Sequence, residues 1–225
     1  MTDFSFDIVG FDLDGTLVDS SGDLAAAVNV MLASDGRPTL SVPQIVAMTG
    51  GGVAQLVRLA LEATGDAAPE EVKRLQAVML ASYEANIAVL TRPYPGAVAA
   101  IEALRARGVR TAIVTNKLAA LSEKLLHELG LRDLFDTLIG GDTMGAGQQK
   151  PDSAPLHEMV RQLGNASARN RGAFVGDTMF DVTAARNAGL PVVVVDFGRE
   201  PVEGFGADAV IDHYDALIPT LERLA

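Results

Sequence analysis

Short apolar runs alternate with helical patterns along most of the chain. Residues 6–11, FDIVGF, have the length and composition of a buried strand. Between runs of this kind, apolar residues recur at the three- and four-residue spacing of helices. Strands that alternate with helices are typical of a parallel α/β sheet. The pattern predicts further strands at residues 110–115, 137–140, 172–176 and 192–196, and helices at residues 95–107, 118–129, 153–163 and 180–188.

Residues 19–91 depart from this alternation. A helical pattern begins at Leu24, and residues 53–61 and 71–90 also predict helices, with no strand pattern between them. About seventy residues are too many for a plain crossover between two strands. We therefore expect a helical domain inserted after the first strand. The predicted division is a discontinuous core of residues 1–18 and 92–225 and an inserted cap domain of residues 19–91, with residues 92–96 as the return hinge.

Composition narrows the classes of function. The 225 residues carry a formal net charge of −11 and no run of Lys or Arg, which disfavours binding to nucleic acid or to anionic lipid. Because there are no cysteines, disulfides, thiolate metal sites and cysteine nucleophiles are excluded. No apolar stretch approaches membrane-spanning length, and acidic residues interrupt any signal-peptide pattern at the N-terminus. We expect a cytoplasmic protein, either a monomer or a homodimer, that binds no membrane.

Two carboxylates mark the end of the first predicted strand. Asp12 and Asp14 are two residues apart, so on an extended chain both point to the same side. A calcium-binding EF-hand loop that began at Asp12 would need Gly and Glu where Leu17 and Asp23 stand. One carboxylate of such a pair can attack phosphorus, and the other can transfer protons to the leaving group and from water. A polar strand end remains the structural alternative.

Three further positions follow predicted strands or loops of the same sheet. Thr115, with Asn116, precedes a predicted helix and suits a phosphate site, although an ordinary helix cap is the alternative. Lys150 precedes Pro151, which we expect to open a helix. Asp177 and Asp181 form an i, i+4 acid pair that a cation would stabilise; a solvated helix surface is the alternative. Taken together, these groups supply the nucleophile, cation, metal ligands and acid/base of phosphoryl transfer.

Four segments resemble the motifs of the haloacid dehalogenase superfamily, in the order of that family. They are FDLDGTLVDS (11–20), IVTNK (113–117), KPDSAPL (150–156) and VGDTMFDV (175–182). The match covers almost the whole chain. Within the superfamily, the chain most resembles the bacterial phosphoglycolate phosphatases. The resemblance implies a Rossmann-like core of three layers, a parallel sheet between helices, with an all-helical cap inserted after the first motif.

The resemblance also implies roles for individual residues. Asp12 would be the nucleophile and Asp14 the general acid/base, and Lys150 would hold the phosphate and the nucleophile in place. Thr115 and the backbone at Asn116 would bind the phosphate. Magnesium would take the Asp12 carboxylate, the Asp14 backbone carbonyl and Asp177, with Asp181 nearby. The chain departs from the family pattern at Ser153, Thr178 and Gly198-Arg199, none of which is a proposed catalytic group.

Substrate preference is expected to lie in the cap. Gly51 and Gly52 follow Gly50 and open a predicted helix, so their N–H groups could face an anion; a flexible turn is the alternative. Arg58 and Arg92 are candidate partners for a substrate carboxylate, with a role on the surface as the alternative that we favour for each. No aromatic residue lies between Val18 and Ser82, which disfavours stacking on a nucleotide base.

The predicted function is hydrolysis of a small anionic phosphate ester, with Mg²⁺ as cofactor and 2-phosphoglycolate as substrate. Another small ester, such as a sugar phosphate, and a phosphomutase activity are the enzymatic alternatives, although the cap has no histidine of the kind that mutases use. A phospho-aspartate signalling domain is the alternative without turnover. Such domains are about half this length, and the helical insert and Asp14 favour turnover.

Overall fold

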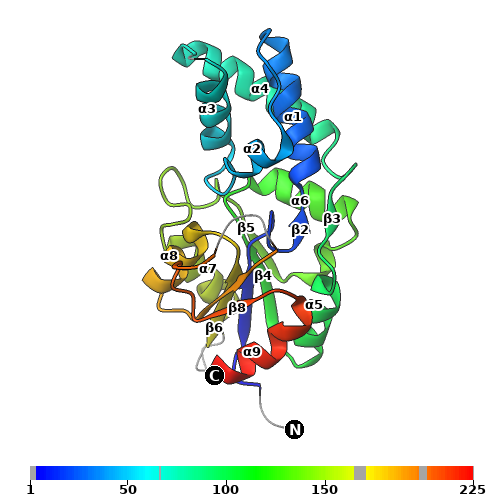
Figure 1. Ribbon diagram of the computed structural model, residues 1–225. Helices are drawn as coiled ribbons and strands as arrows, with labels where there is room; N and C mark the ends of the chain where they lie inside the picture. The colour runs from blue at the N-terminus through cyan, green and yellow to red at the C-terminus, as the bar shows by residue number, and fades with distance from the viewer. Residues whose placement is uncertain (1–3, 66, 165–170, 198–201, 225) are drawn as a thin grey trace.

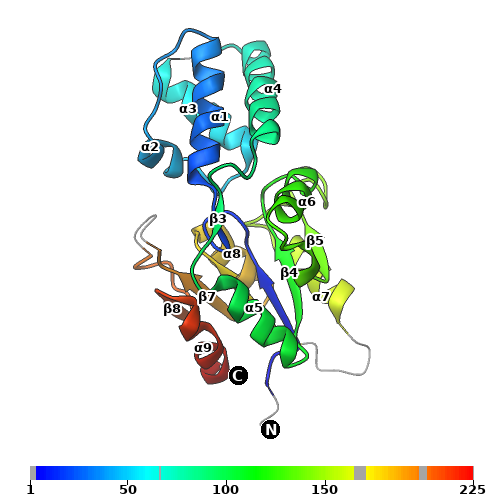
Figure 2. The same ribbon diagram turned by 90° about the vertical axis from the view of Figure 1, so that its right-hand side faces the viewer.

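The protein is described by a computed structural model that covers residues 4–65, 67–164, 171–197 and 202–224. A parallel sheet flanked by helices forms one end, and a group of helices forms the other (Figures 1 and 2). The departure noted at Gly198-Arg199 lies outside the described residues.

The sheet has six parallel strands among the described residues. Its order is β5-β4-β1-β6-β7-β8, so β1 is central, between β4 and β6. After β1 the strands are added outward through β4 and β5 on one side, and then through β6, β7 and β8 on the other. In an open α/β sheet, the crevice at the carboxyl ends of the strands at such a point is where ligands bind. The strands are β1 (Ile8–Phe11), β4 (Arg110–Val114), β5 (Thr137–Ile139), β6 (Gly172–Gly176), β7 (Val192–Val195) and β8 (Ala209–Ile211).

Both faces of the sheet are buried, which explains the continuous apolar runs in the sequence. Along β1, Val9 and Phe11 pack on one face and Ile8 on the other. Gly10 points toward the second face, where an added Cβ would lie 2.3 Å from the Met159 sulfur. The close approach of the neighbouring helix therefore requires glycine at position 10.

Helices cover the two faces as separate layers, which lie on opposite sides of the strands in Figure 1. One cluster of buried side chains joins the first face to α5 (Ala97–Ala106), α6 (Ala119–Glu128) and α9 (Leu217–Leu224). A second cluster joins the other face to α7 (Ala154–Leu163) and α8 (Met179–Asn187). The predicted Rossmann-like arrangement of three layers is confirmed.

Helices form the opposite end of the molecule (Figure 1), four of them in the described residues. We call this group the cap. Its interior is apolar, with Met31, Leu75 and Tyr83 among the buried side chains. The cap helices are α1 (Ser21–Ser34), α2 (Val42–Val46), α3 (Val53–Thr64) and α4 (Pro69–Ala85).

Two chain segments connect the cap to the sheet. They pair as the short antiparallel strands β2 (Val18–Asp19) and β3 (Arg92–Pro93). The buried Asp23 carboxylate accepts hydrogen bonds from the Leu90 and Thr91 backbone N–H groups, at 3.0 and 2.9 Å, and from the Thr91 hydroxyl at 2.7 Å. The two segments are thereby tied together beside the predicted boundaries. The division into two domains stays a prediction.

Several predicted helix boundaries differ from the observed ones, most of them by three residues or fewer. The helix predicted over residues 71–90 ends at Ala85, with Asn86 as its C-cap. At the predicted end, the Leu90 and Thr91 N–H groups donate to the Asp23 carboxylate, so that part of the chain is held by α1. Pro151 does not open α7, which begins three residues later at Ala154.

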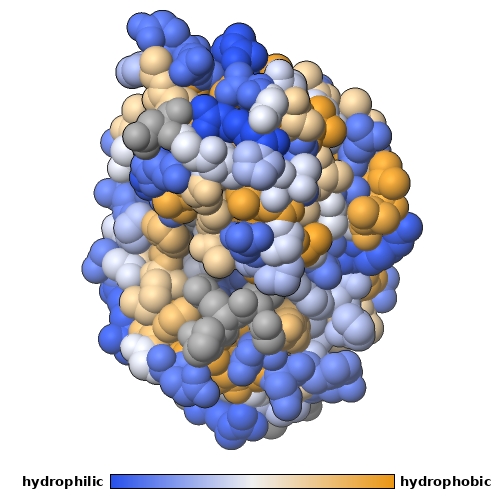
Figure 3. All heavy atoms as spheres, turned by 45° about the horizontal axis from the view of Figure 1, so that its top comes forward, coloured by the Kyte–Doolittle hydropathy of each residue, from blue (hydrophilic) through white to orange (hydrophobic). Residues whose placement is uncertain are grey.

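No helix within the described ranges combines the length and the apolar composition needed to cross a membrane. On the face shown in Figure 3, hydrophilic and hydrophobic side chains are interspersed, and hydrophilic side chains predominate around the edge.

Candidate active site

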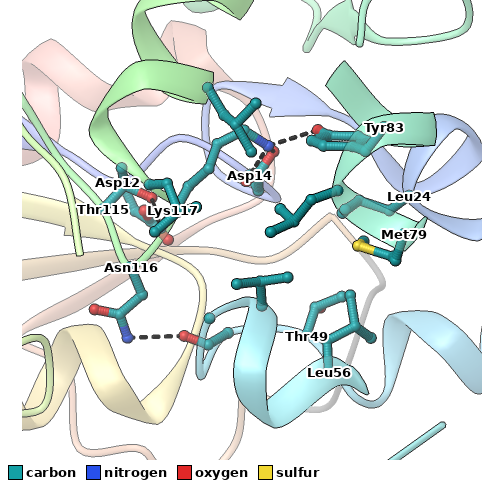
Figure 4. Close-up of a pocket in the computed structure, with 16 residues that line it drawn as sticks. Asp12, Asp14, Leu24, Thr49, Leu56, Met79, Tyr83, Thr115, Asn116 and Lys117 are labelled. Carbon is teal, nitrogen blue, oxygen red and sulfur yellow. Dashed lines mark hydrogen bonds and ion pairs between the residues drawn. The ribbon is translucent and has the colours of Figure 1, made fainter. Parts of the chain in front are cut away.

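Asp12 and Asp14 lie just beyond the carboxyl end of β1. The Asp12 N–H donates to the Val175 carbonyl at 2.9 Å, so the chain stays attached to β6 for one residue after the strand. Both aspartates line a pocket between the sheet and the cap (Figure 4). The spacing of two residues therefore does place the two acids on one site.

Lys150 is buried between two carboxylates. Its Nζ lies 3.1 Å from Asp12 Oδ1 and 2.6 Å from Asp181 Oδ1, and only 2% of the residue is exposed. Burial by itself lowers the pKa of the Lys150 ammonium, but Asp12 and Asp181 outweigh this and raise it above its ordinary value. The ammonium is held charged beside Asp12.

The pKa of Asp12 is raised to about 6, chiefly because burial disfavours the charged carboxylate. The Lys150 ammonium opposes this rise, and the Asp181 carboxylate adds to it. A hydrogen bond from the Thr115 hydroxyl also favours the ionised form. The site therefore holds an acid that is costly to ionise without a further cation.

Asp177 and Asp181 are both buried at the start of α8, and they have different partners. Asp177 Oδ1 accepts a hydrogen bond from the Thr16 hydroxyl at 2.8 Å. Asp181 Oδ2 accepts from the Thr178 N–H and hydroxyl at 2.9 and 2.6 Å, while its Oδ1 binds Lys150. Both Asp181 oxygens are occupied, so this residue orients Lys150 and the first turn of α8.

Three carboxylates come close enough together to surround a cation. Oxygens of Asp12, Asp177 and Asp181 lie within 4.8 Å of one another. Asp12 Oδ1 has the Lys150 ammonium 3.1 Å away but accepts no well-aligned hydrogen bond from the described residues, so it keeps a lone pair for a metal. A buried set of hard oxygen ligands suits Mg²⁺, so the donor set fits that metal.

Thr115 and Asn116 follow β4, as the sequence predicts, and both line the pocket. The Asn116 Nδ2 donates at 2.9 Å to the Gly50 carbonyl of the cap and at 2.9 Å to the Lys150 carbonyl. Asn116 therefore connects the cap to the loop that carries Lys150.

The cap glycines are not equivalent. Gly50 and Gly52 line the pocket, whereas Gly51 is not among its lining residues. Arg58 also lies away from it, as an exposed partner of Glu62 at 2.7 Å, and Arg92 donates to the Thr91 carbonyl at 2.6 Å. Neither arginine is among the pocket-lining residues of the described chain.

Sequence reasoning missed Lys117 and Tyr83. Lys117 Nζ lies 3.0 Å from Asp14 Oδ2 and 2.5 Å from the Tyr83 hydroxyl (Figure 4). Burial lowers the pKa of the Lys117 ammonium, but Asp14 and Tyr83 outweigh it and hold the pKa above its usual range. Burial raises the pKa of Tyr83 to about 12. Lys117 is the last residue of the IVTNK segment, so its place in that motif is the sequence feature that could have identified it as a site residue.

Aliphatic side chains form much of the remaining pocket wall. The pocket has a volume of about 600 Å³, including its open mouth. Its wall opposite the aspartates comes from the cap and from the start of α6. The aliphatic side chains are Leu24, Val53, Leu56, Met79, Leu80, Leu118 and Leu121.

Comparisons with known proteins agree on one family. A family model for haloacid dehalogenase-like hydrolases matches residues 6–189. A phosphoglycolate phosphatase of Cereibacter sphaeroides is 40% identical over 220 residues, covering 96% of this chain and 98% of that protein. One from Rhodospirillum rubrum is 40% identical, covering 92% and 87%. A solved structure, described as a predicted phosphoglycolate phosphatase from Haemophilus somnus 129pt, matches with a TM-score of 0.88 at 29% identity and covers 95% of this chain and 97% of its own.

Proposed function

The chain belongs to the haloacid dehalogenase-like hydrolases and is a phosphatase, and we propose that it hydrolyses 2-phosphoglycolate through a phospho-aspartate on Asp12. One observation carries the proposed mechanism. Two aspartates of one pocket stand at the carboxyl end of the central strand, one paired with Lys150 and the other with Lys117. Two carboxylates with separate partners can take separate roles.

Asp12 is the proposed nucleophile. Its carboxylate oxygen attacks phosphorus, and the bond from phosphorus to the leaving alcohol oxygen breaks. Lys150 balances the charge of Asp12 in the free enzyme and stays beside the phosphoryl group that Asp12 accepts. Thr115 and the backbone at Asn116 would bind the phosphate oxygens at the end of β4.

Asp14 is the proposed general acid/base. It gives its proton to the departing alcohol oxygen, and then takes a proton from the water that attacks the acyl phosphate. That second displacement releases inorganic phosphate and restores the Asp12 carboxylate. The two steps balance, because the proton lost by Asp14 returns from water.

Asp12 and Asp177, together with the Asp14 backbone carbonyl, would hold Mg²⁺. The metal, when bound, supplies positive charge against the phosphate dianion and the clustered carboxylates. Asp181 acts beside this set, since Lys150 and Thr178 occupy its oxygens.

The substrate proposal rests on the names of the relatives and on the pocket. The two curated relatives named above, which match this chain along most of its length, carry the name phosphoglycolate phosphatase. The aliphatic side chains opposite Asp12 offer few partners for the hydroxyl groups of a sugar, which favours a small leaving group. The cap also provides no stacked pair of aromatic rings for a base, since Tyr83 is the one aromatic residue that lines the pocket in the described chain.

A comparison of substrates tests this proposal. We expect the purified enzyme with Mg²⁺ to give a higher kcat/KM for 2-phosphoglycolate than for hexose phosphates, nucleotides or pyrophosphate. Asp12→Asn, purified in parallel, controls for contaminating phosphatases. A preference for a sugar phosphate by tenfold or more, about 1.4 kcal/mol, would remove the glycolate assignment and leave the phosphatase assignment standing.

A further inference from the structure

Lys117 joins three parts of the chain that are distant in sequence. Its Nζ contacts both oxygens of Asp14, at 3.0 and 3.2 Å, in the loop after β1. It also contacts the Tyr83 hydroxyl at 2.5 Å and lies 4.3 Å from the centre of the Tyr83 ring. Tyr83 belongs to α4 of the cap, so a cap residue touches the lysine that binds Asp14 (Figure 4).

The contact among Lys117, Asp14 and Tyr83 is largely buried, and the lysine ammonium has a hydrogen-bond acceptor on both other residues. Only 6% of the Lys117 side chain and 18% of the Asp14 side chain are exposed, and Tyr83 is buried in the cap interior. An ion pair held in this way is much less free to move than one on the surface. The two pocket aspartates are also held separately, because Lys150 binds Asp12 and Lys117 binds Asp14.

We infer that Lys117 and Tyr83 are positioning residues, which hold the Asp14 carboxylate in place for proton transfer and make that placement depend on the cap. The inference rests on the proposed role of Asp14. A general acid must lie within about 2.6–3.2 Å of the oxygen it protonates, so a carboxylate that loses its partner loses efficiency by rotating away. Because Tyr83 comes from the cap, the acid is aligned only when the cap rests on the core.

A direct contact with the substrate is the competing role for Lys117. Its three N–H groups are already directed by Asp14 and Tyr83, which favours positioning. The two roles predict different dependence on the leaving group. In the steps up to release of the alcohol, positioning matters only where the leaving oxygen needs a proton, whereas binding matters for any substrate that carries the recognised group.

The test uses Lys117→Met and Tyr83→Phe on two substrates that differ in the leaving group. One is 2-phosphoglycolate, whose alkoxide must be protonated, and the other is an aryl phosphate whose phenolate leaves without a proton. For Lys117→Met we expect kcat/KM to fall roughly 10–100-fold on the alkyl ester and less than about threefold on the aryl ester. Tyr83→Phe keeps the ring over Lys117, so it should give a smaller loss in the same direction.

A burst of phenol supplies a second readout. Since kcat/KM covers the steps up to release of the alcohol, the aryl ester still forms the phospho-enzyme in these variants. Its breakdown needs Asp14 to activate water, so we expect a rapid burst of phenol followed by slow turnover. A variant damaged only in its fold would show a reduced rate without a burst.

A double-mutant comparison shows whether Lys117 acts through Asp14. Adding Lys117→Met to Asp14→Asn should cause no further loss on 2-phosphoglycolate, because the group that it positions has been removed. Additive losses, or equal losses on the alkyl and aryl esters, would overturn the inference. Retained turnover in Asp12→Asn would instead overturn the proposed function, so the two failures are distinguishable.

The controls come from the same chain. Lys124→Met removes a partly exposed lysine of α6 that pairs with Glu128, and it should leave turnover of both substrates unaffected. Lys117→Arg tests rescue by a retained cation. If Lys117→Met melts below the assay temperature, Tyr83→Phe tests the inference by itself. Its ratio of kcat/KM for the aryl ester to kcat/KM for the alkyl ester must still rise above that of the wild type.

Discussion

At the scale of single residues, the site concentrates carboxylates that are hard to keep charged together. Asp12 and Asp181 share Lys150, and Asp177 lies close enough to share a cation with both. Like charges at this distance destabilise the protein unless a cation compensates them. The arrangement favours binding of a metal and of a phosphoryl group over stability.

Asp12→Asn should abolish turnover while the protein still folds. The amide has nearly the same shape, but it cannot attack phosphorus, so the loss should reach many orders of magnitude. Steady-state hydrolysis by pure protein checks this, with Asp133→Asn as an exposed control on the 3₁₀ turn Arg132–Leu134. Appreciable turnover by Asp12→Asn would contradict the nucleophile assignment.

The same residue should affect stability in a pH-dependent way when metal is chelated. The pKa of Asp12 rises from 3.8 to about 6 on folding, so the folded state holds this proton more tightly. Its contribution to stability is complete below pH 3.8 and is lost as the pH rises through about 6. Asp12→Asn cannot ionise and escapes that loss.

Melting temperatures of wild type and Asp12→Asn in chelator would measure this effect. The melting temperature of Asp12→Asn should rise relative to that of the wild type when the pH is raised from about 4.5 to about 7.5. Asp133→Asn controls for the removal of one negative charge. A constant difference between Asp12→Asn and wild type at the two pH values would show that burial does not shift Asp12.

Asp177 and Lys150 should separate metal binding from catalysis. Asp177→Ala removes a proposed ligand and should raise the Mg²⁺ concentration for half-maximal activity by at least about tenfold. Lys150→Ala should lower activity without a comparable change in that concentration, because the lysine balances charge beside Asp12. Magnesium titrations of both variants are the measurement, and equal shifts in the two would contradict the separate roles.

At the scale of elements, the pattern of the sequence predicted five of the strands of the sheet and the helices between them. It missed β8, which has three residues and only one buried side chain, too short for a periodic signal. It also extended the last cap helix past Ala85 to residue 90, where the Leu90 and Thr91 N–H groups donate to Asp23, a residue far away in sequence. Local pattern predicts the type of an element better than its end.

The turn before α3 should tolerate substitution unequally. Gly52 lines the pocket with a φ of +83°, and an added Cβ would lie 3.2 Å from the Asn116 carbonyl oxygen. At Gly51 the three atoms nearest to an added Cβ all belong to the end of the flexible Gln55 side chain. Gly52→Val should therefore reduce the preference for 2-phosphoglycolate over an unhindered aryl phosphate, and Gly51→Val should do so less.

The ratio of kcat/KM values for the two substrates in each variant tests this difference. Gly51→Val serves as the matched control, since it adds the same side chain one residue away. An equal change in both variants would mean that the pocket-facing position of Gly52 is irrelevant to selectivity.

At the scale of the whole molecule, the pocket exists only where the cap meets the core. Motif residues on separate strands predicted Asp12, Asp14, Thr115 and Lys150 at one edge of the sheet, and the structure brings them there. Tyr83 was not predicted, because no local pattern relates it to Lys117 or Asp14. Contacts between cap and core depend on how the two parts pack, which spacing along the chain does not encode.

The central claim is that phosphate passes through Asp12, and trapping that intermediate tests it most directly. We propose to quench the enzyme with Mg²⁺ and 2-phosphoglycolate during turnover, to reduce the acyl phosphate with borohydride, and to locate the product by mass spectrometry. Reduction of a phospho-aspartate yields homoserine in its place. The account predicts homoserine at position 12, dependent on substrate, whereas unmodified Asp12 with modification at another carboxylate would contradict it.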